Sequence, residues 1–219
     1  MKGSGGARRA PRSTPRPRGR PPGRSSRDGV IAGRDALLAA AERAIARDGP
    51  RVTLDAIAAE AGVTKPILYR GVGDRDALVF ALAERLTRRM TDQVAEQVAR
   101  TEDPEDMLRR LVRGYLELAA AQRNLYLFVT AGGVGDERLQ QSLLLADGAA
   151  QQFVDGIAAF RSARGADPAV ATVWSYGLVG SLHYVTLWWL REPSLELETV
   201  TEHITSLLWT GLRLEEPVD

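Results

Sequence analysis

The sequence predicts an all-α fold of about nine helices, and three observations support this prediction. Short apolar segments with helical spacing are separated by glycine turns between residues 53 and 78. N-cap and proline pairs open further helices up to about residue 214, and no segment has the pattern of a credible strand. A chain of 219 residues has room for a small domain and a second core. We therefore expect a basic tail over residues 1–30, a three-helix domain over 31–80 and a second helical domain over 81–219.

A helix-turn-helix pattern begins at Thr53, which is a suitable N-cap. Leu54, Ile57 and Ala58 follow at a spacing that places them on one face of a short helix. Gly62 stands where this helix must end, because glycine adopts a left-handed backbone without steric cost. A short helix, a glycine turn and a second short helix are together typical of DNA-binding domains.

The second helix of this motif begins at about Lys65, because Pro66 is tolerated only in the first turn of a helix. Thr64 precedes it as the N-cap. The exposed face of this helix then presents Lys65, Pro66, Tyr69 and Arg70. Two cations, a phenol and a rigid apolar ring at a helix start suit a major groove bordered by phosphates. The alternative, from spacing alone, is an alanine-rich helical hairpin without a DNA function.

A larger set of positions extends this motif over residues 33–82. The set comprises residues 36–41, Gly49, and residues 52–58, 61–64, 68–69 and 74–78. On these residues the segment resembles the N-terminal domain of the TetR family of one-component transcriptional regulators. The resemblance implies a helical C-terminal domain that binds an effector and dimerises. It also implies DNA contacts by Thr53, by residues 64–66 and by Tyr69, and a phosphate contact by Arg75.

The segment departs from the family pattern directly after Tyr69. The family usually has a variable residue, then histidine or tyrosine, then phenylalanine, whereas this chain has Arg70, Gly71 and Val72. Gly71 therefore lacks the side chain that helps to hold the DNA backbone in relatives, and Val72 fills less volume than an aromatic ring. We expect weaker intrinsic DNA affinity, and we expect Gly71→His to increase it.

The N-terminal tail is strongly basic. Residues 1–34 hold ten Lys or Arg and one acid, a net charge of +9, whereas the whole chain carries +1 and the remainder therefore −8. Five prolines and a lack of apolar residues predict a disordered tail, and no apolar run marks it as a secretory signal. Arg18, Gly19 and Arg20 resemble the core of an AT-hook, in which arginines enter a narrow A·T minor groove. The alternative is an untargeted basic tail that raises affinity for any nucleic acid.

Residue types that carry catalysis or bind metals are scarce. Cysteine is absent, and the two histidines, His183 and His203, lie on different predicted helices without a neighbouring ligand. The glycine-rich segment 131–136 has no preceding strand and is interpreted as a loop. No nucleophile-elbow, zinc or phosphate-loop motif occurs. We expect no enzymatic activity, no metal and no cofactor.

The rest of the chain is predicted to be helical throughout. Asp103 and Asp167 each precede a proline, which is the N-cap and first-turn pair that opens a helix. Breaks at glycine, proline and polar clusters delimit the other elements. The predicted helices cover residues 74–100, 104–121, 125–131, 137–160, 168–191 and 195–214.

The predicted helix over 168–191 contains 22 residues without a formal charge, Ala169 to Leu190, which is long enough to cross a bilayer. Its many hydroxyl, glycine and histidine residues make a membrane span costly, so we expect none. Gly177 and Ser181 instead offer a shallow strip where another helix can approach closely. We expect a homodimer through this helix and the last one, with ordinary core packing as the alternative. The expected interface residues are Gly177, Ser181, Leu182, Val200, Ile204, Leu207 and Leu208.

Aromatic side chains of the C-terminal domain suggest an effector pocket, because rings supply apolar surface and hydroxyls can orient a ligand. Few charges fall on the inward helix faces, which favours an apolar or weakly polar effector. Plain core packing is the alternative for each residue. The expected pocket residues are Tyr115, Leu118, Tyr126, Phe128, Phe153, Trp174 and Tyr184.

Together with the TetR resemblance, these observations predict a cytoplasmic homodimeric repressor that binds double-stranded DNA at a palindromic operator. The resemblance implies that a small effector would release it by favouring the spacing that does not fit the operator. The second hypothesis is an architectural or non-specific DNA-binding protein, in which the tail supplies most of the affinity and no effector exists. A ligand-binding protein without a DNA function is disfavoured by the segment from Lys65 to Arg70.

Overall fold

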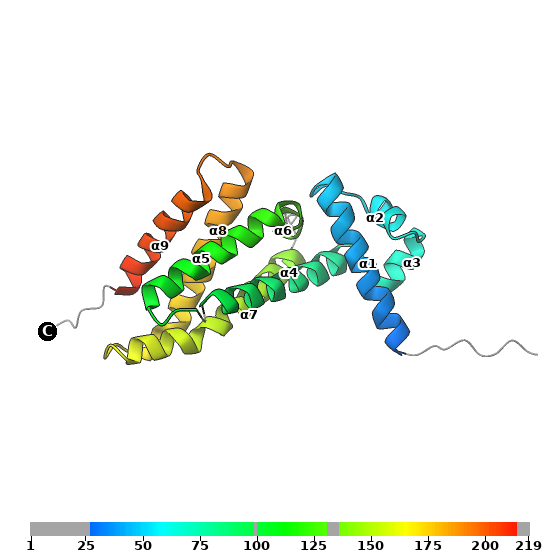
Figure 1. The fold of residues 1–219 in the computed structure, drawn as a ribbon. Helices are drawn as coiled ribbons and strands as arrows, with labels where there is room; N and C mark the ends of the chain where they lie inside the picture. Colours follow the sequence, from blue (N-terminus) through cyan, green and yellow to red (C-terminus); the bar gives the residue numbers. More distant parts are fainter. Residues whose placement is uncertain (1–26, 99, 131–135, 214–219) are drawn as a thin grey trace, which may run out of the picture.

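The computed structural model describes residues 27–98, 100–130 and 136–213, and every element within these ranges is a helix (Figure 1). The predicted all-α fold is confirmed. The elements are α1 (Arg27–Asp48), α2 (Leu54–Glu60), α3 (Lys65–Val72), α4 (Arg75–Val98), α5 (Pro104–Ala121), α6 (Arg123–Thr130), α7 (Asp136–Ser162), the 3-10 turn η1 (Pro168–Val170), α8 (Ala171–Arg191) and α9 (Leu197–Arg213).

Helices α1, α2 and α3 form a small unit at one end of the molecule, and α4 leads from it into the remaining helices (Figure 1). Its core is apolar, with Ile45 and Ile57 at 0% exposure and Leu68 at 1%. Leu78 of α4, also at 0%, belongs to the same core cluster. Burying four large aliphatic side chains stabilises such a unit by roughly 1.5–3 kcal/mol each.

Helices α5, α6 and α7 pack against α4, and α8 and α9 pack against this group. Helix α4 packs on α5, α5 packs on α9, and α7 packs on α8. The Asp103 carboxylate accepts a hydrogen bond from the Asp106 amide at 2.8 Å, which caps α5 as the sequence predicts. Asp167 caps the following turn in the same way, accepting from the Ala169 amide at 2.9 Å. Because that turn is a 3-10 segment, α8 begins at Ala171 rather than at residue 168.

Most of the uncharged run lies in α8, whose buried side includes Leu178, Leu182 and Leu190. Among the described residues, no helix combines the length and the apolar character that a membrane crossing requires.

Candidate DNA-binding surface and effector domain

Two local signals set the start and the end of α2. The Thr53 hydroxyl accepts a hydrogen bond from the Ala56 amide at 3.2 Å, so Thr53 caps α2 as the sequence predicts. Gly62 has a φ of 66°, in the left-handed region where glycine has no Cβ penalty. The Val63 amide then donates to the Ala58 carbonyl at 3.0 Å, which closes the end of α2. The chain can therefore enter α3 immediately after the turn.

Helix α3 separates a buried side from an exposed one. Leu68 and Val72 are 1% and 3% exposed and face the core. Thr64 is the N-cap, but its hydroxyl makes no capping hydrogen bond. The predicted contact residues Thr64, Lys65, Pro66, Tyr69 and Arg70 are all exposed. We define this set as the α3 face.

Two details of the exposed side of α3 could not be foreseen from the pattern. Ile67 is 46% exposed, comparable with Tyr69 at 42%, although an isoleucine beside Leu68 suggests core. The Lys65 ammonium lies 3.0 Å from the Asp55 carboxylate. Exposed pairs of this kind contribute at most about 1 kcal/mol, so Lys65 can leave Asp55 for a phosphate at little cost.

Gly71 lies against α1 and not at an open position. A Cβ at this residue would overlap Cδ1 of Leu37. Leu37 therefore takes space that a side chain after Tyr69 and Arg70 would need. The Gly71→His variant must move Leu37 before its imidazole can approach DNA.

Arg75 points into the protein. Its Nη1 donates to the Val52 carbonyl at 3.2 Å, and its guanidinium carbon lies 5.1 Å from the centre of the Phe128 ring. Val52 directly precedes the N-cap of α2, whereas Phe128 belongs to α6. One side chain thus touches both the helix-turn-helix unit and the C-terminal helices.

A chain of hydrogen bonds runs through the interior of the C-terminal domain. The hydroxyls of Tyr115 and Tyr126 are 3.1 Å apart, and the Tyr126 hydroxyl lies 3.0 Å from Nδ1 of His183. Burial raises the pKa of both tyrosines above the ordinary phenol value. Burial lowers the pKa of His183, so a neutral imidazole is favoured. These three hydrogen-bonded side chains are therefore polar but uncharged at neutral pH.

Only part of the predicted effector pocket is brought together. Tyr115 and Tyr126 are adjacent, and Tyr126 contacts His183. The sequence did not reveal this contact, because His183 has no partner nearby in the chain. Leu118 and Phe153 are partly buried against the core, and Phe128 is buried beside Arg75. Tyr184 was wrongly placed, because it is 73% exposed on the outer side of α8.

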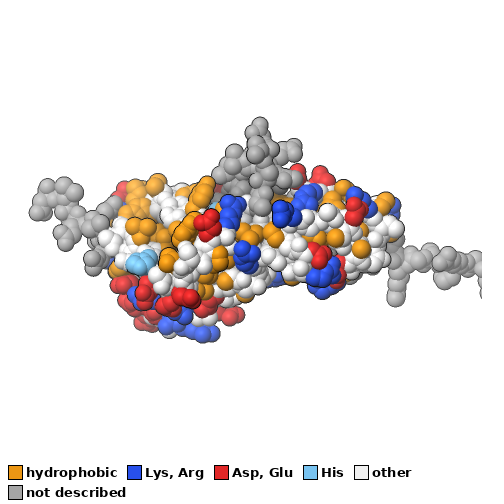
Figure 2. All heavy atoms as spheres, turned by 90° about the horizontal axis from the view of Figure 1, so that it is seen from above, with side chains coloured by type: hydrophobic (Ala, Val, Ile, Leu, Met, Phe, Trp, Pro, Cys, Tyr) orange, Lys and Arg blue, Asp and Glu red, His pale blue; other side chains and the backbone are white. Residues whose placement is uncertain are grey.

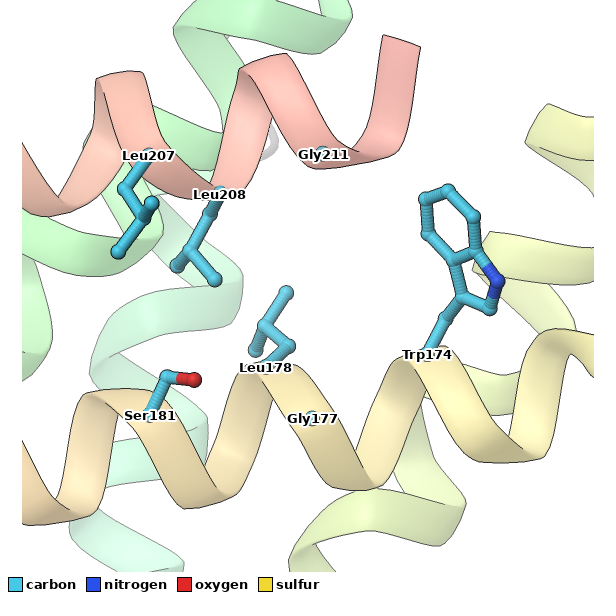
Figure 3. A pocket seen from close by; sticks show the side chains of 7 residues that line it. All are labelled: Trp174, Gly177, Leu178, Ser181, Leu207, Leu208 and Gly211. Carbon is cyan, nitrogen blue, oxygen red and sulfur yellow. The ribbon is translucent and has the colours of Figure 1, made fainter. Parts of the chain in front are cut away.

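Trp174 likewise lies apart from the tyrosines. Its ring is covered by the guanidinium of Arg161, whose carbon is 4.6 Å from the ring centre. Trp174 also forms one end of an apolar groove of about 290 Å³ between α8 and α9 (Figure 3). The groove is lined by Trp174, Gly177, Leu178, Ser181, Leu207, Leu208 and Gly211.

The groove continues into an exposed apolar strip on α8. Val173, Tyr184 and Trp188 are 71%, 73% and 46% exposed, and Leu207 of α9 is 67% exposed. These four residues, with Gly177, Ser181, Leu208 and Gly211 of the groove, are called the α8–α9 face. Leu182, Val200 and Ile204 were expected in the interface, but at 3–5% exposure they belong to the core of the protomer, and those three assignments are corrected.

Charge is unevenly distributed over the surface. Figure 2 shows Asp and Glu side chains gathered over the C-terminal helices, at the end away from α1–α3. This agrees with the net charge of −8 on residues 35–219. Arg18, Gly19 and Arg20 of the basic tail lie outside the described residues.

The N-terminal unit matches the sequence model of a known protein family. Residues 37–82 match the sequence model described as "Bacterial regulatory proteins, tetR family". An uncharacterized HTH-type transcriptional regulator of Mycobacterium tuberculosis is 29% identical over 187 residues, which cover 82% of this chain and 76% of that protein.

Two solved structures share the fold over 81% and 80% of this chain. The transcriptional regulator FadR from Bacillus subtilis, in complex with stearoyl-CoA, has a TM-score of 0.66 at 15% identity and covers 81% of this chain and 98% of its own. AibR, in complex with isovaleryl coenzyme A and operator DNA, has a TM-score of 0.56 at 20% identity and covers 80% and 97%. At these sequence identities the similarity shows the fold alone.

Proposed function

We propose that this chain, a transcriptional regulator that belongs to the TetR family by its helix-turn-helix domain, is a ligand-responsive repressor and not an enzyme. It would bind a palindromic operator as a homodimer in the cytoplasm, and a small effector would release it. The observation that carries the proposal is the α3 face, where polar and cationic side chains stand exposed on a helix held by Gly62 and Leu68.

The proposed DNA contacts are made by Thr53 and by the α3 face. Tyr69 has the exposure and the rigidity to contact base edges, whereas Lys65 and Arg70 suit the phosphates that border the groove. Thr53 is exposed at the start of α2. In helix-turn-helix motifs this first helix crosses the DNA backbone. Arg18 and Arg20 of the tail are proposed to enter an adjacent A·T minor groove.

The α8–α9 face is the proposed dimer interface. An apolar strip beside a groove floored by Gly177 and Gly211 lets a helix of a second copy approach closely (Figure 3). Exposed side chains such as Val173 and Leu207 would lose contact with water in that contact. A two-fold axis through this face pairs two α3 helices, as a palindromic site requires.

The proposed effector binds beside the hydrogen-bonded Tyr115, Tyr126 and His183. Neutral hydroxyl and imidazole groups among buried leucines favour a mainly apolar molecule with one neutral hydrogen-bonding group. FadR and AibR share the fold and were solved with stearoyl-CoA and isovaleryl coenzyme A. The acyl chain and thioester carbonyl of such molecules match this description, and their charged nucleotide would have to stay in solvent. Acyl thioesters are therefore the first effectors to test.

The proposal is tested by selecting bound fragments from a random DNA pool at near-physiological salt, with the full chain and with a variant lacking residues 1–30. A palindrome shared by both proteins supports a specific dimeric regulator. Enrichment of A·T pairs beside it with the full chain alone supports the minor-groove role of the tail. If neither protein selects a motif and binding vanishes at raised salt, the non-specific, tail-driven function is correct.

A further inference from the structure

Helix α4 carries two arginines that each bridge the N-terminal unit and the C-terminal helices. Arg75 joins the Val52 carbonyl to the Phe128 ring. Arg89 donates from Nη2 to both Glu42 oxygens of α1 at 2.8 Å, and from Nη1 to the Gln122 side chain at 3.1 Å. Both bridges therefore end on the segment from Gln122 to Phe128.

That segment also contacts α1 directly, because the Asn124 side-chain amide donates to the Ala46 carbonyl at 3.0 Å. The Arg89 and Asn124 contacts reach α1, which carries no residue of the proposed DNA contact set. Arg75 alone among the three reaches the backbone next to Thr53, the first residue of that set.

We propose that Arg75 is a positioning residue, which holds the start of α2 at a place set by Phe128 of α6, and that it does not contact a DNA phosphate. The inference rests on the proposed DNA-binding function. The guanidinium is a planar cation that can lie over a ring while one of its N–H groups donates to a carbonyl. Val52 and Phe128 are both 4% exposed, so the two anchors are themselves held by the core.

The geometry links the start of α2 to α6 through one side chain of α4. A shift of α6 moves the Phe128 ring, and Arg75 transmits that shift to Val52 and so to the Thr53 cap. The guanidinium also carries N–H groups other than the one that donates to Val52, so a phosphate contact is the competing role. The two roles predict different responses to salt.

The first test measures unfolding of the full chain by urea without DNA, for Arg75→Gln, Phe128→Leu and the double variant. A positioning contact makes the effects of the two substitutions non-additive. The matched control pairs Arg75→Gln with Phe160→Leu, because the Phe160 ring is covered by Arg164 and not by Arg75. Additive effects in both pairs would overturn the proposal, whether or not the protein binds DNA.

The second test measures operator affinity against salt concentration. Loss of one phosphate contact per protomer lowers the slope of log affinity against log salt by about 0.9 for each contact, or about two for a dimer. We expect Arg75→Gln to weaken binding about tenfold with an unchanged slope, and Arg70→Gln to reduce the slope. A reduced slope for Arg75→Gln, or full binding by it, would overturn the proposal.

The conservative variant Arg75→Lys separates charge from geometry. Lysine keeps the cation that a phosphate needs but lacks the planar group that lies over Phe128. We expect Arg75→Lys to behave as Arg75→Gln does, and restored affinity would overturn the proposal. Failure of the unsubstituted protein to bind any selected site would count against the proposed function, while the urea measurements would still decide the role of Arg75.

Discussion

The N-terminal and C-terminal domains distribute polar and apolar side chains in opposite ways. Around α2 and α3 the buried residues are apolar, such as Ile57 and Leu68, and the exposed face is mainly polar. Among the C-terminal helices, the hydrogen-bonded tyrosines and His183 lie in the interior. Large apolar residues such as Val173 and Leu207 are exposed there. The N-terminal helices thus present polar groups to solvent, as the proposed DNA-binding role requires. The C-terminal helices present apolar groups to solvent and keep polar groups inside, as the proposed dimer contact and effector site require.

The largest expected effect comes from charging the apolar exterior. The double variant Tyr184→Arg, Leu207→Arg places cations on the α8–α9 face, so two copies would repel each other and the dimer would dissociate. Loss of bivalent binding lowers apparent operator affinity by about 10²–10⁴-fold. Titration of labelled operator measures this loss.

The matched control for that variant is Ser206→Arg. Ser206 is exposed on α9 but does not line the groove, so it tests added charge alone. We expect its operator affinity to stay within a few-fold of the unsubstituted protein. Equal losses in both proteins would mean that the face plays no part in dimerisation.

The next effect comes from truncating the polar exterior of the N-terminal domain. Tyr69→Ala removes a candidate base contact, which costs about 1–3 kcal/mol of binding, or roughly tenfold to a hundredfold. Because Tyr69 is 42% exposed, we expect the melting temperature to change little. Binding assays and thermal unfolding on the same preparations check both parts. A large fall in melting temperature with unchanged relative affinity for the site would make Tyr69 a core residue.

A smaller effect tests how tightly α3 lies against α1. Gly71→Ala places a Cβ on Cδ1 of Leu37, which is the tip of a half-buried side chain and can move away at modest cost. Because that cost offsets part of the roughly 1 kcal/mol gained from helix propensity, we expect a net gain of less than about 1 kcal/mol in urea unfolding.

The full gain should appear in the Leu37→Ala background, where Gly71→Ala has room. The predicted gain in affinity from Gly71→His is also best measured there. If Gly71→Ala destabilises the protein with Leu37 intact, the leucine is held in place and the contact limits how closely α3 can lie to α1.

The smallest effect concerns pH and the polar interior. Burial lowers the pKa of His183 in the folded state, so the unfolded chain binds more protons below its own pKa of about 6.5. The stability that His183 contributes is therefore full above that pH and decreases as the pH falls below it. We expect urea unfolding between pH 7.5 and 5.5 to show this loss, and His183→Gln to reduce it. An unchanged pH dependence in the variant would assign the loss to other groups.

Local signals explain why the N-terminal domain could be predicted so fully. Thr53, Gly62 and Pro66 each act on their own turn, and the observed bounds of α2 and α3 follow from them. The exposure of Tyr69 follows from the period of a single short helix. Arg75 is the exception, because its partner Phe128 is 53 residues away and belongs to another helix.

The C-terminal domain could be predicted only as a set of helices. Helix α8 is apolar on nearly every side, so its pattern did not show that Tyr184 faces outward while Leu182 faces the core. On α9, Val200 and Leu207 are both apolar, yet one packs inside the protomer and the other is 67% exposed. Which apolar stripe packs against which partner is a tertiary property, and so is the link between His183 and Tyr126.

In the proposed repressor, a second copy of the chain covers the α8–α9 face. Sedimentation equilibrium of the full-length protein, alone and with the selected operator, measures how many copies associate. We expect a free particle of about twice 23.8 kDa and two chains per palindromic site. A particle of one chain mass that still binds the palindrome with full affinity would show that the face has no second copy on it.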